Sequence, residues 1–278
     1  MIDVHIHAVN PRLPGLKALP GFLEDSPERV ANILRRQMQE SGTEIVLAMG
    51  RIPGNADDPL GINSTLRISA FLPELHAIGI ADPLQTDNAH LNRVEEQLRS
   101  GKVKALKGYL GYLYYGPESP NYAPYYELAA QFQIPFIFHT GDNYSIIAKL
   151  KYAQPLLVDE VAVEHPDVNF VLAHFGNPWI TDAAEVIYKN DNVWADLSGL
   201  LVGDEVFFER LSEDGTLRRV IERVKEGIEF TSRHDRILYG TDWPLVPMRV
   251  YGDFVRQIVP EEYHQLVFRE NAKALFKL

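Results

Sequence analysis

Residues 2–7 read Ile2-Asp3-Val4-His5-Ile6-His7, an apolar strand pattern that carries two histidines. Because side chains alternate across a β-strand, Asp3, His5 and His7 share one face. Two imidazoles placed two residues apart can therefore converge on one ion. Packed or surface histidines give the same spacing, so the rest of the chain decides between the two interpretations.

Short runs rich in β-branched and aromatic residues recur along the chain, and segments with helical periodicity separate them. We expect eight strands, at residues 2–7, 44–49, 76–81, 103–109, 135–139, 169–174, 193–197 and 237–241. Strands that alternate with helices predict βα units and a parallel sheet. The length of 278 residues is close to the roughly 250 of a TIM barrel, so we expect a single (β/α)8 TIM-barrel domain over residues 1–278.

The segments between the strands carry signals for helix starts and stops. Ser26 followed by Pro27 predicts a helix start, and Gly42 predicts its end. Asp87 predicts the cap of a second helix. Further helices are expected at residues 125–132, 157–163, 182–188, 217–228 and 260–278.

Composition limits the chemistry and the partners. The chain contains no cysteine, which excludes disulfides and thiolate metal sites, so any metal must bind to nitrogen and oxygen. The net charge of −11 disfavours nucleic acid and anionic membranes as partners. No apolar run approaches the ~18 residues of a membrane helix. We expect a cytoplasmic enzyme that acts on a small-molecule substrate, and we leave open whether it is a homodimer.

Three further strands end in a polar residue that has a glycine two positions away. His139, His174 and Asp242 each follow an apolar run. In a parallel barrel the carboxyl ends of all strands meet at one rim, so these groups should lie together. Buried imidazoles and carboxylates are costly unless they are hydrogen-bonded, paired or bound to a cation. We therefore expect a metal site at this rim; the alternative is that neighbouring backbone satisfies each group separately.

The combination of motifs resembles a known family. The stretch His5-Ile6-His7, the strand-terminal His139 and His174, and Gly-Thr-Asp-Trp-Pro at 240–244 are similar to the metal motif of the amidohydrolase superfamily. Lys-Gly-Tyr-Leu-Gly-Tyr at 107–112 and Glu-Asn-Ala-Lys-Ala-Leu-Phe at 270–276 resemble its amidohydrolase-related (amidohydrolase 2) branch of metal-dependent TIM-barrel hydrolases and decarboxylases. The resemblance spans essentially the whole chain and is specific for fold and metal, but not for substrate.

The resemblance implies one divalent ion rather than two. Its ligands would be His5, His7, His139 and Asp242, and His174 would be left to contact substrate or water. Neutral imidazoles and a carboxylate suit zinc, with manganese or iron as alternatives. In two-metal members of the superfamily a lysine at the position of Lys107 is carbamylated and bridges the ions; the alternatives here are a partner for a substrate carboxylate or a solvated lysine.

We expect a hydrolase that uses a metal-activated water to cleave an amide, ester or lactone bond of a small molecule. Asp242 would accept a proton from the water, and His174 would steady the oxyanion or pass the proton to the leaving group. The first alternative is a non-oxidative decarboxylase of a carboxylated aromatic or enoic acid. The second is a metal-independent lactonase or a non-catalytic binding barrel.

The long loops expected at residues 10–25 and 51–63 belong to the catalytic face of such a barrel. Arg12 and Arg51 follow the first two strands, where each could bind a substrate carboxylate or be a surface arginine. Tyr109 and Tyr112 follow the fourth strand, where they could line a pocket or pack in a subunit interface.

Three aspartates stand near the expected site. Asp3 could orient an imidazole or be a simple carboxylate at a strand start. Asp142 and Asp196 lie near strand ends, where contact with a ligand residue or with substrate is an alternative to a structural role. The histidines at 76, 90, 165, 234 and 264 lie away from the expected carboxyl ends and are predicted to be structural or solvated.

Overall fold

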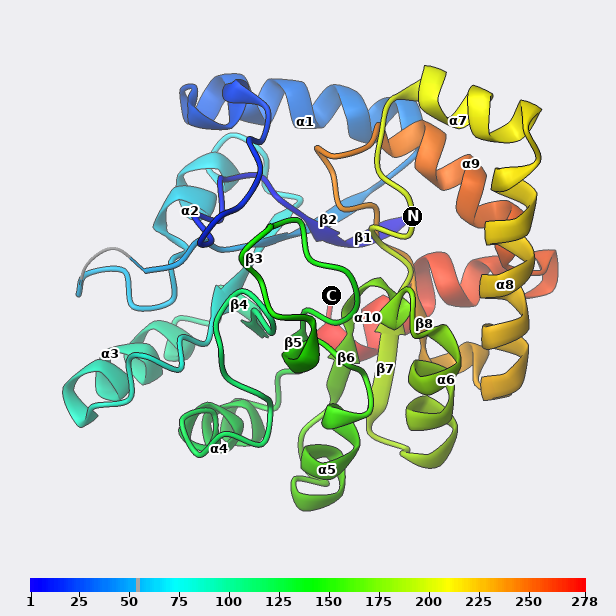
Figure 1. Ribbon diagram of the computed structural model, residues 1–278. Helices are drawn as coiled ribbons and strands as arrows, with labels where there is room; N and C mark the ends of the chain where they lie inside the picture. The colour runs from blue at the N-terminus through cyan, green and yellow to red at the C-terminus, as the bar shows by residue number, and fades with distance from the viewer. Residues whose placement is uncertain (54–55) are drawn as a thin grey trace.

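The computed structural model describes residues 1–53 and 56–278. Eight parallel strands follow one another in chain order around a barrel (Figure 1). They are Ile2–Ile6 (β1), Ile45–Met49 (β2), Leu75–Ile80 (β3), Val103–Gly108 (β4), Phe136–Phe138 (β5), Phe170–Leu172 (β6), Val193–Asp196 (β7) and Ile237–Leu238 (β8). The barrel closes because the Val4 amide donates to the Tyr239 carbonyl at 3.0 Å and the Asp242 amide donates to the His5 carbonyl at 2.8 Å. The predicted (β/α)8 TIM barrel is confirmed.

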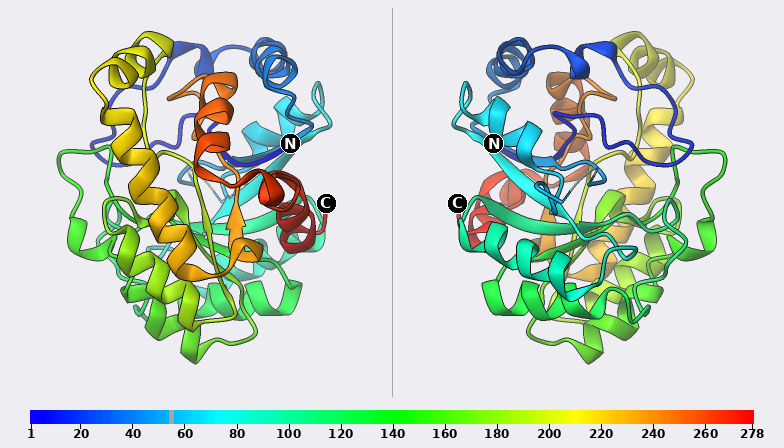
Figure 2. Two further views of the ribbon diagram at one scale, coloured as in Figure 1. Left: turned by 90° about the vertical axis from the view of Figure 1, so that its right-hand side faces the viewer. Right: turned by 90° about the vertical axis from the view of Figure 1, so that its left-hand side faces the viewer.

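Helices surround the strands on the outside (Figures 1 and 2). The α-helices are Pro27–Ser41 (α1), Asn63–Ser69 (α2), Asn88–Arg99 (α3), Ala123–Phe132 (α4), Leu157–Glu164 (α5), Ile180–Lys189 (α6), Glu205–Glu213 (α7), Thr216–Thr231 (α8), Met248–Ile258 (α9) and Asn271–Phe276 (α10). The predicted caps of α1 and α3 are confirmed: the Arg29 amide donates to Ser26 Oγ at 3.3 Å, and the His90 amide donates to Asp87 Oδ1 at 3.0 Å. None of the helices in the described ranges has the length and apolar character that crossing a membrane requires.

Three helices were not predicted. Helix α2 has only seven residues and no capping side chain, so its sequence carries little signal. Helices α7 and α9 did offer signals: Asp204 caps α7, and an apolar stripe of Tyr251, Phe254, Val255 and Ile258 runs along α9. Gly54 and Asn55, in the loop expected at 51–63, lie outside the described residues.

The helical segment expected at residues 260–278 is confirmed, although it is not one uniform α-helix. The segment is divided into a 3-10 turn (Glu261–Tyr263), a π-helical turn (Leu266–Glu270) and α10. Contacts with the barrel explain the division. The Val267 carbonyl accepts from the Tyr239 amide at 3.2 Å, and the Asn271 side-chain amide donates to the Ile237 carbonyl at 2.7 Å, which ties this segment to β8.

Apolar side chains fill the barrel away from the predicted rim. Val4, Leu47, Ile78, Ile137 and Val171 belong to one buried cluster to which all eight strands contribute. Residues of α10 pack in the same cluster, which closes the amino-terminal end of the barrel. The polar groups at the carboxyl ends of the strands therefore form the floor of an open cavity at the other end of the barrel.

Candidate active site

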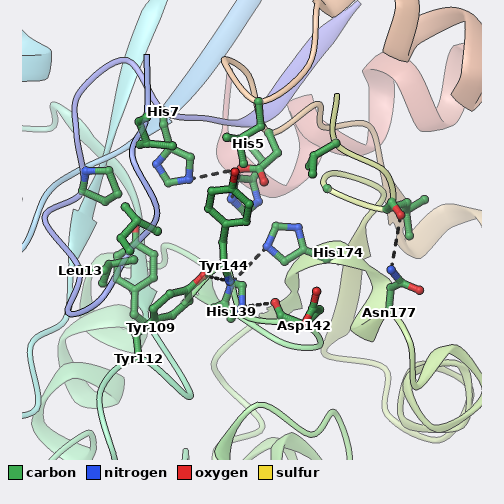
Figure 3. Close-up of a pocket in the computed structure, with 18 of the residues that line it drawn as sticks. His5, His7, Leu13, Tyr109, Tyr112, His139, Asp142, Tyr144, His174 and Asn177 are labelled. Atoms are coloured by element: carbon green, nitrogen blue, oxygen red, sulfur yellow. Dashed lines mark hydrogen bonds and ion pairs between the residues drawn. The ribbon is translucent and has the colours of Figure 1, made fainter. Parts of the chain in front are cut away.

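A cavity of about 300 Å³ opens at the carboxyl ends of the strands. The five residues that the sequence singled out at this rim all line it: Asp242, and His5, His7, His139 and His174, which Figure 3 labels. His5 lies in β1, and His7 and His139 directly follow β1 and β5. His174 lies two residues after β6, and Asp242 lies four residues after β8. The structure therefore brings together side chains that lie up to 237 positions apart in the chain.

The backbone turns sharply where two of these side chains are presented. His174 and Asp242 have φ values of 61° and 68°, a left-handed backbone conformation that residues other than glycine rarely adopt. β6 ends two residues before His174 and β8 ends four residues before Asp242, so both strands are shorter than expected. The turn directs the side chain into the cavity instead of leaving it on a face of the sheet. Gly199 leaves the space for it, because a Cβ there would lie 2.5 Å from His174 Nδ1.

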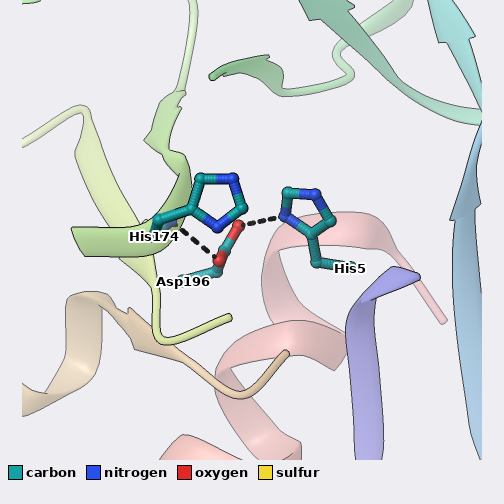
Figure 4. A group of neighbouring side chains, drawn as sticks. All are labelled: His5, His174 and Asp196. Carbon is teal, nitrogen blue, oxygen red and sulfur yellow. Dashed lines mark hydrogen bonds and ion pairs between the residues drawn. The ribbon is translucent and has the colours of Figure 1, made fainter. Parts of the chain in front are cut away.

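Asp196 holds the ring of His5 from behind. Its Oδ2 accepts from His5 Nδ1 at 2.9 Å, and its Oδ1 accepts from the His174 amide at 3.2 Å (Figure 4). Oδ1 also accepts from the amide and the hydroxyl of Ser198. Since Asp196 Oδ2 fixes the proton on His5 Nδ1, the lone pair of His5 Nε2 is left free. Asp196 therefore orients the His5 ring, which is one of the alternatives that the sequence left open for it.

His139 and His174 face each other through ring nitrogens that carry no proton. A backbone carbonyl, that of Asp142, lies 2.9 Å from His139 Nε2, and the Ser198 carbonyl lies 3.1 Å from His174 Nδ1. A carbonyl oxygen can only accept, so each of these nitrogens carries the ring proton. The remaining nitrogens, His139 Nδ1 and His174 Nε2, lie 3.2 Å apart and present lone pairs to each other when both rings are neutral.

Burial keeps these rings neutral. It lowers the pKa of His5 to about 4 and lowers the pKa of His174 and, strongly, that of His139 below their ordinary value. Burial also raises the pKa of the Asp242 carboxyl, but the neighbouring histidines, His7 first, outweigh it and hold that pKa below its ordinary value. The site thus combines neutral imidazoles with an ionised carboxylate.

Unpaired acceptors converge at the floor of the cavity. Asp242 Oδ1 lies 3.3 Å from His7 Nε2, the contact that lowers its pKa, and 3.7 Å from His5 Nε2, but neither contact is a well-formed hydrogen bond within residues 1–53 and 56–278. The possible ligand atoms of these three residues all lie within 4.8 Å of one another. His139 lies outside this compact group, although its free Nδ1 faces the same cavity. A buried acceptor without a donor is costly, so the donor set fits a divalent cation.

Lys107 lies beneath the site and is fully buried. The solvated alternative is therefore wrong: β4 directs this side chain into the barrel, where burial lowers its pKa to about 8. Its Nζ has no hydrogen-bond partner in the described part of the chain and lies 5.5 Å from the centre of the Tyr109 ring. Lys107 is not among the described residues that line the cavity. A bridging role or contact with substrate stays a prediction.

The two arginines proposed for substrate binding lie elsewhere in this conformation. Arg12 is exposed, in a left-handed turn with φ 56°, and Arg51 lines a separate hollow beside α1 and α2. Tyr109 and Tyr112, by contrast, line the cavity. The Tyr112 hydroxyl accepts from the Tyr144 amide at 2.6 Å, which fixes the loop after β5 over the site.

Asp3 does not contact an imidazole. Its carboxylate accepts from the Thr241 hydroxyl at 2.7 Å and from the amides of Thr241 and His5 at 3.1 Å. It therefore fastens β1 to the segment that carries Asp242. Ser198, which contacts both Asp196 and His174, was missed by sequence reasoning; its place two residues after the strand-end Asp196 was the available signal.

Comparison with known proteins identifies the family of this chain. The amidohydrolase family model matches residues 2–278, nearly the whole chain. The chain belongs to the amidohydrolase family. No curated protein sequence matches this member of the family.

Solved structures similar to this amidohydrolase share its fold at low sequence identity. An uncharacterised TIM-barrel protein from Bordetella bronchiseptica has a TM-score of 0.70 and 18% identity, covering 99% of this chain and 98% of that one. A probable 2-pyrone-4,6-dicarboxylic acid hydrolase from Acinetobacter baumannii has a TM-score of 0.65 and 14% identity, covering 100% and 99%. The 5-carboxyvanillate decarboxylase from Sphingomonas paucimobilis has a TM-score of 0.62 and 13% identity, covering 100% and 98%.

Proposed function

We propose that this amidohydrolase is a metal-dependent hydrolase that cleaves an amide, ester or lactone bond of a small molecule. The observation that supports the proposal most directly is the cluster at the cavity floor, where the Nε2 atoms of His5 and His7 lie within 3.7 Å of Asp242 Oδ1 without a well-formed hydrogen bond among the described residues. Burial of such a group is costly unless a cation is present.

His5, His7, His139 and Asp242 would hold the ion. The nitrogen and oxygen donors suit zinc, with manganese or iron as alternatives. When bound, such an ion lowers the pKa of water, so that hydroxide is available near neutral pH, and polarises a carbonyl group. Asp196 keeps the proton of His5 on Nδ1 and so keeps Nε2 free for this role.

Two residues would move protons. Asp242 is ionised and faces the cavity, so it can accept the proton that water loses as it attacks a carbonyl carbon. His174 lines the same cavity, and its ring is held by the Ser198 carbonyl on Nδ1. Its Nε2 faces the site, where it can steady the developing oxyanion once protonated or pass a proton to the leaving group.

The first test is metal dependence. We expect purified protein to contain about one divalent ion per chain, to lose hydrolytic activity after treatment with a chelator, and to regain it on addition of zinc or manganese. Protein without metal, with turnover that the added ion does not change, would refute the proposal in favour of a metal-independent lactonase or a non-catalytic barrel.

The second test uses variants of the two proton carriers. Asp242→Asn and His174→Ala should each lower kcat by a factor on the order of 10²–10⁴, the range of general acid–base catalysis, while the fold survives. His165→Ala, a histidine outside the cavity, serves as the control and should keep its activity. Near wild-type turnover in both site variants would show that these roles are assigned wrongly.

A decarboxylase is the second candidate, because a solved structure with this fold is named as a carboxyvanillate decarboxylase. Measuring carbon dioxide release against hydrolysis product on one substrate panel separates the two reactions. Cytoplasmic location and a homodimer also stay predictions.

A further inference from the structure

Apolar side chains form the wall of the cavity above the polar floor. Leu13, Leu16 and Leu19 come from the loop after β1, and Leu200, Leu201 and Phe207 come from the segment after β7 and the start of α7. The two segments face each other across the opening. A ligand that reaches the floor must therefore place most of its surface against hydrocarbon.

Aromatic rings complete the wall on the side of His139. Tyr112 lies edge-on to the His139 ring, with centroids 4.9 Å apart, and Tyr109 lies edge-on to Tyr112 at 6.1 Å. The hydroxyl of Tyr112 already accepts from the Tyr144 amide. These rings offer flat apolar surface, and the volume of about 300 Å³ suits a small ligand.

No lysine or arginine is among the described residues that line the cavity. Its charged side chains are Asp142 and Asp242, besides the histidines. Three cations come near the cavity without lining it. The Lys107 ammonium lies beneath the floor, 5.5 Å from the centre of the Tyr109 ring. The Lys17 ammonium lies 4.7 Å from the centre of the Tyr144 ring, and the Arg223 guanidinium donates to Asn177 Oδ1 at 2.7 Å; these two residues are exposed and contact lining side chains from the solvent side.

We propose that this cavity selects an uncharged substrate, with an aliphatic or aromatic group attached next to the bond that is cleaved. The proposal rests on the hydrolase function proposed above and names its substrate class. A carboxylate placed against the leucine wall would lose its hydration without gaining a protein cation, and Asp142 would repel it. A neutral apolar group at the same place gains from its transfer out of water.

A matched pair of esters tests the proposal. Phenyl acetate and 4-acetoxybenzoate carry the same ester and differ by one carboxylate; each rate is normalised to the uncatalysed hydrolysis of that ester. With metal-loaded protein we expect kcat/KM for the neutral ester to be at least about tenfold higher, equivalent to ~1.4 kcal/mol. Equal values, or a preference for the anion, would overturn the proposal.

A charge placed on the wall should change this preference. Leu201→Arg adds a cation to the lining and should lower the neutral-to-anion ratio at least about fivefold. Leu84→Arg makes the same change at an exposed position outside the cavity and should leave the ratio unchanged. Lys17→Met should also leave it unchanged, whereas a rise in the ratio would show that Lys17 serves as an anion contact and would contradict the proposal.

Binding measurements separate failure of this proposal from failure of the hydrolase function. Cinnamamide and cinnamate have nearly the same shape and differ in charge, and calorimetry measures their binding to metal-depleted protein. Tighter binding of the amide without any ester hydrolysis would refute the hydrolase and retain the substrate class. Tighter or equal binding of the acid, or no binding of either at millimolar concentration, would refute the substrate class.

Discussion

Asp196→Asn is the sharpest test of how the chain prepares its metal ligands. The carboxylate accepts four hydrogen bonds: Oδ2 accepts from His5 Nδ1, and Oδ1 accepts from the His174 amide and from the amide and hydroxyl of Ser198. An asparagine can keep the three donors on Oδ1 only if its oxygen takes that place. Its NH₂ group then faces His5 Nδ1, which lies 2.9 Å away.

This arrangement reverses the tautomer of His5. A donor facing Nδ1 requires a lone pair there, so the ring proton must move to Nε2, the nitrogen that points toward Asp242. His5 can then bind a cation only by breaking the bond to the amide or by losing its proton. We expect zinc affinity to fall by roughly 10–100-fold, the usual cost of removing a partner behind a metal ligand, which corresponds to about 1.4–2.7 kcal/mol.

The assay is competition for zinc against a chelator of known affinity, with circular dichroism to verify the fold. Asp58→Asn is the matched control: Asp58 is also buried and accepts from the amides of Ile62 and Asn63, but it lies outside the cavity lining. A zinc affinity in the Asp196→Asn variant equal to that of the control would refute the tautomer argument.

Three other changes test single features of the fold. Lys107→Met should stabilise the metal-free protein by about 3 kcal/mol below pH 8 in urea unfolding, because burial lowers the folded-state pKa of Lys107 to about 8 from its ordinary value of 10.5. The gain should shrink between those two pH values, and a pH-independent difference would contradict this reasoning. Gly199→Ala should lower activity at least about tenfold, because the added Cβ would meet the His174 ring. Gly42 also has a positive φ, but open space surrounds the position of its Cβ, so Gly42→Ala should lower only the stability of the fold, by ~1 kcal/mol. His90→Ala removes a buried hydrogen bond of 3.0 Å and should cost about 1–3 kcal/mol of unfolding free energy with unchanged kcat; a loss of kcat would show that His90 is not merely structural.

The rim of the barrel was predictable because its rule is local and general. His139, His174 and Asp242 each end an apolar run, and the carboxyl ends of parallel strands share one edge in every barrel of this kind. The same rule explains why all of these side chains, with His5 and His7, line one cavity.

What the sequence could not show depends on tertiary contacts. Arg12 lies in a left-handed turn that leaves its side chain exposed. No residue pattern in the sequence indicates whether such a turn directs the side chain to solvent or into the site. Lysine is rarely buried, so the residue type alone could not exclude a solvated Lys107, whereas the fold buries it completely. The apolar wall joins residues of the loop after β1 to Phe207 of α7, a helix that was not predicted.

The left-handed backbone at His174 and Asp242 has a consequence for how variants of this chain should be judged. Glycine would relieve roughly 1–2 kcal/mol at each position, because only a residue without a Cβ adopts that conformation freely. Selection for heat resistance alone would therefore favour glycine at both places and remove an imidazole and a carboxylate from the cavity. At positions 174 and 242, therefore, the residue that would be best for stability differs from the residue that the proposed activity needs.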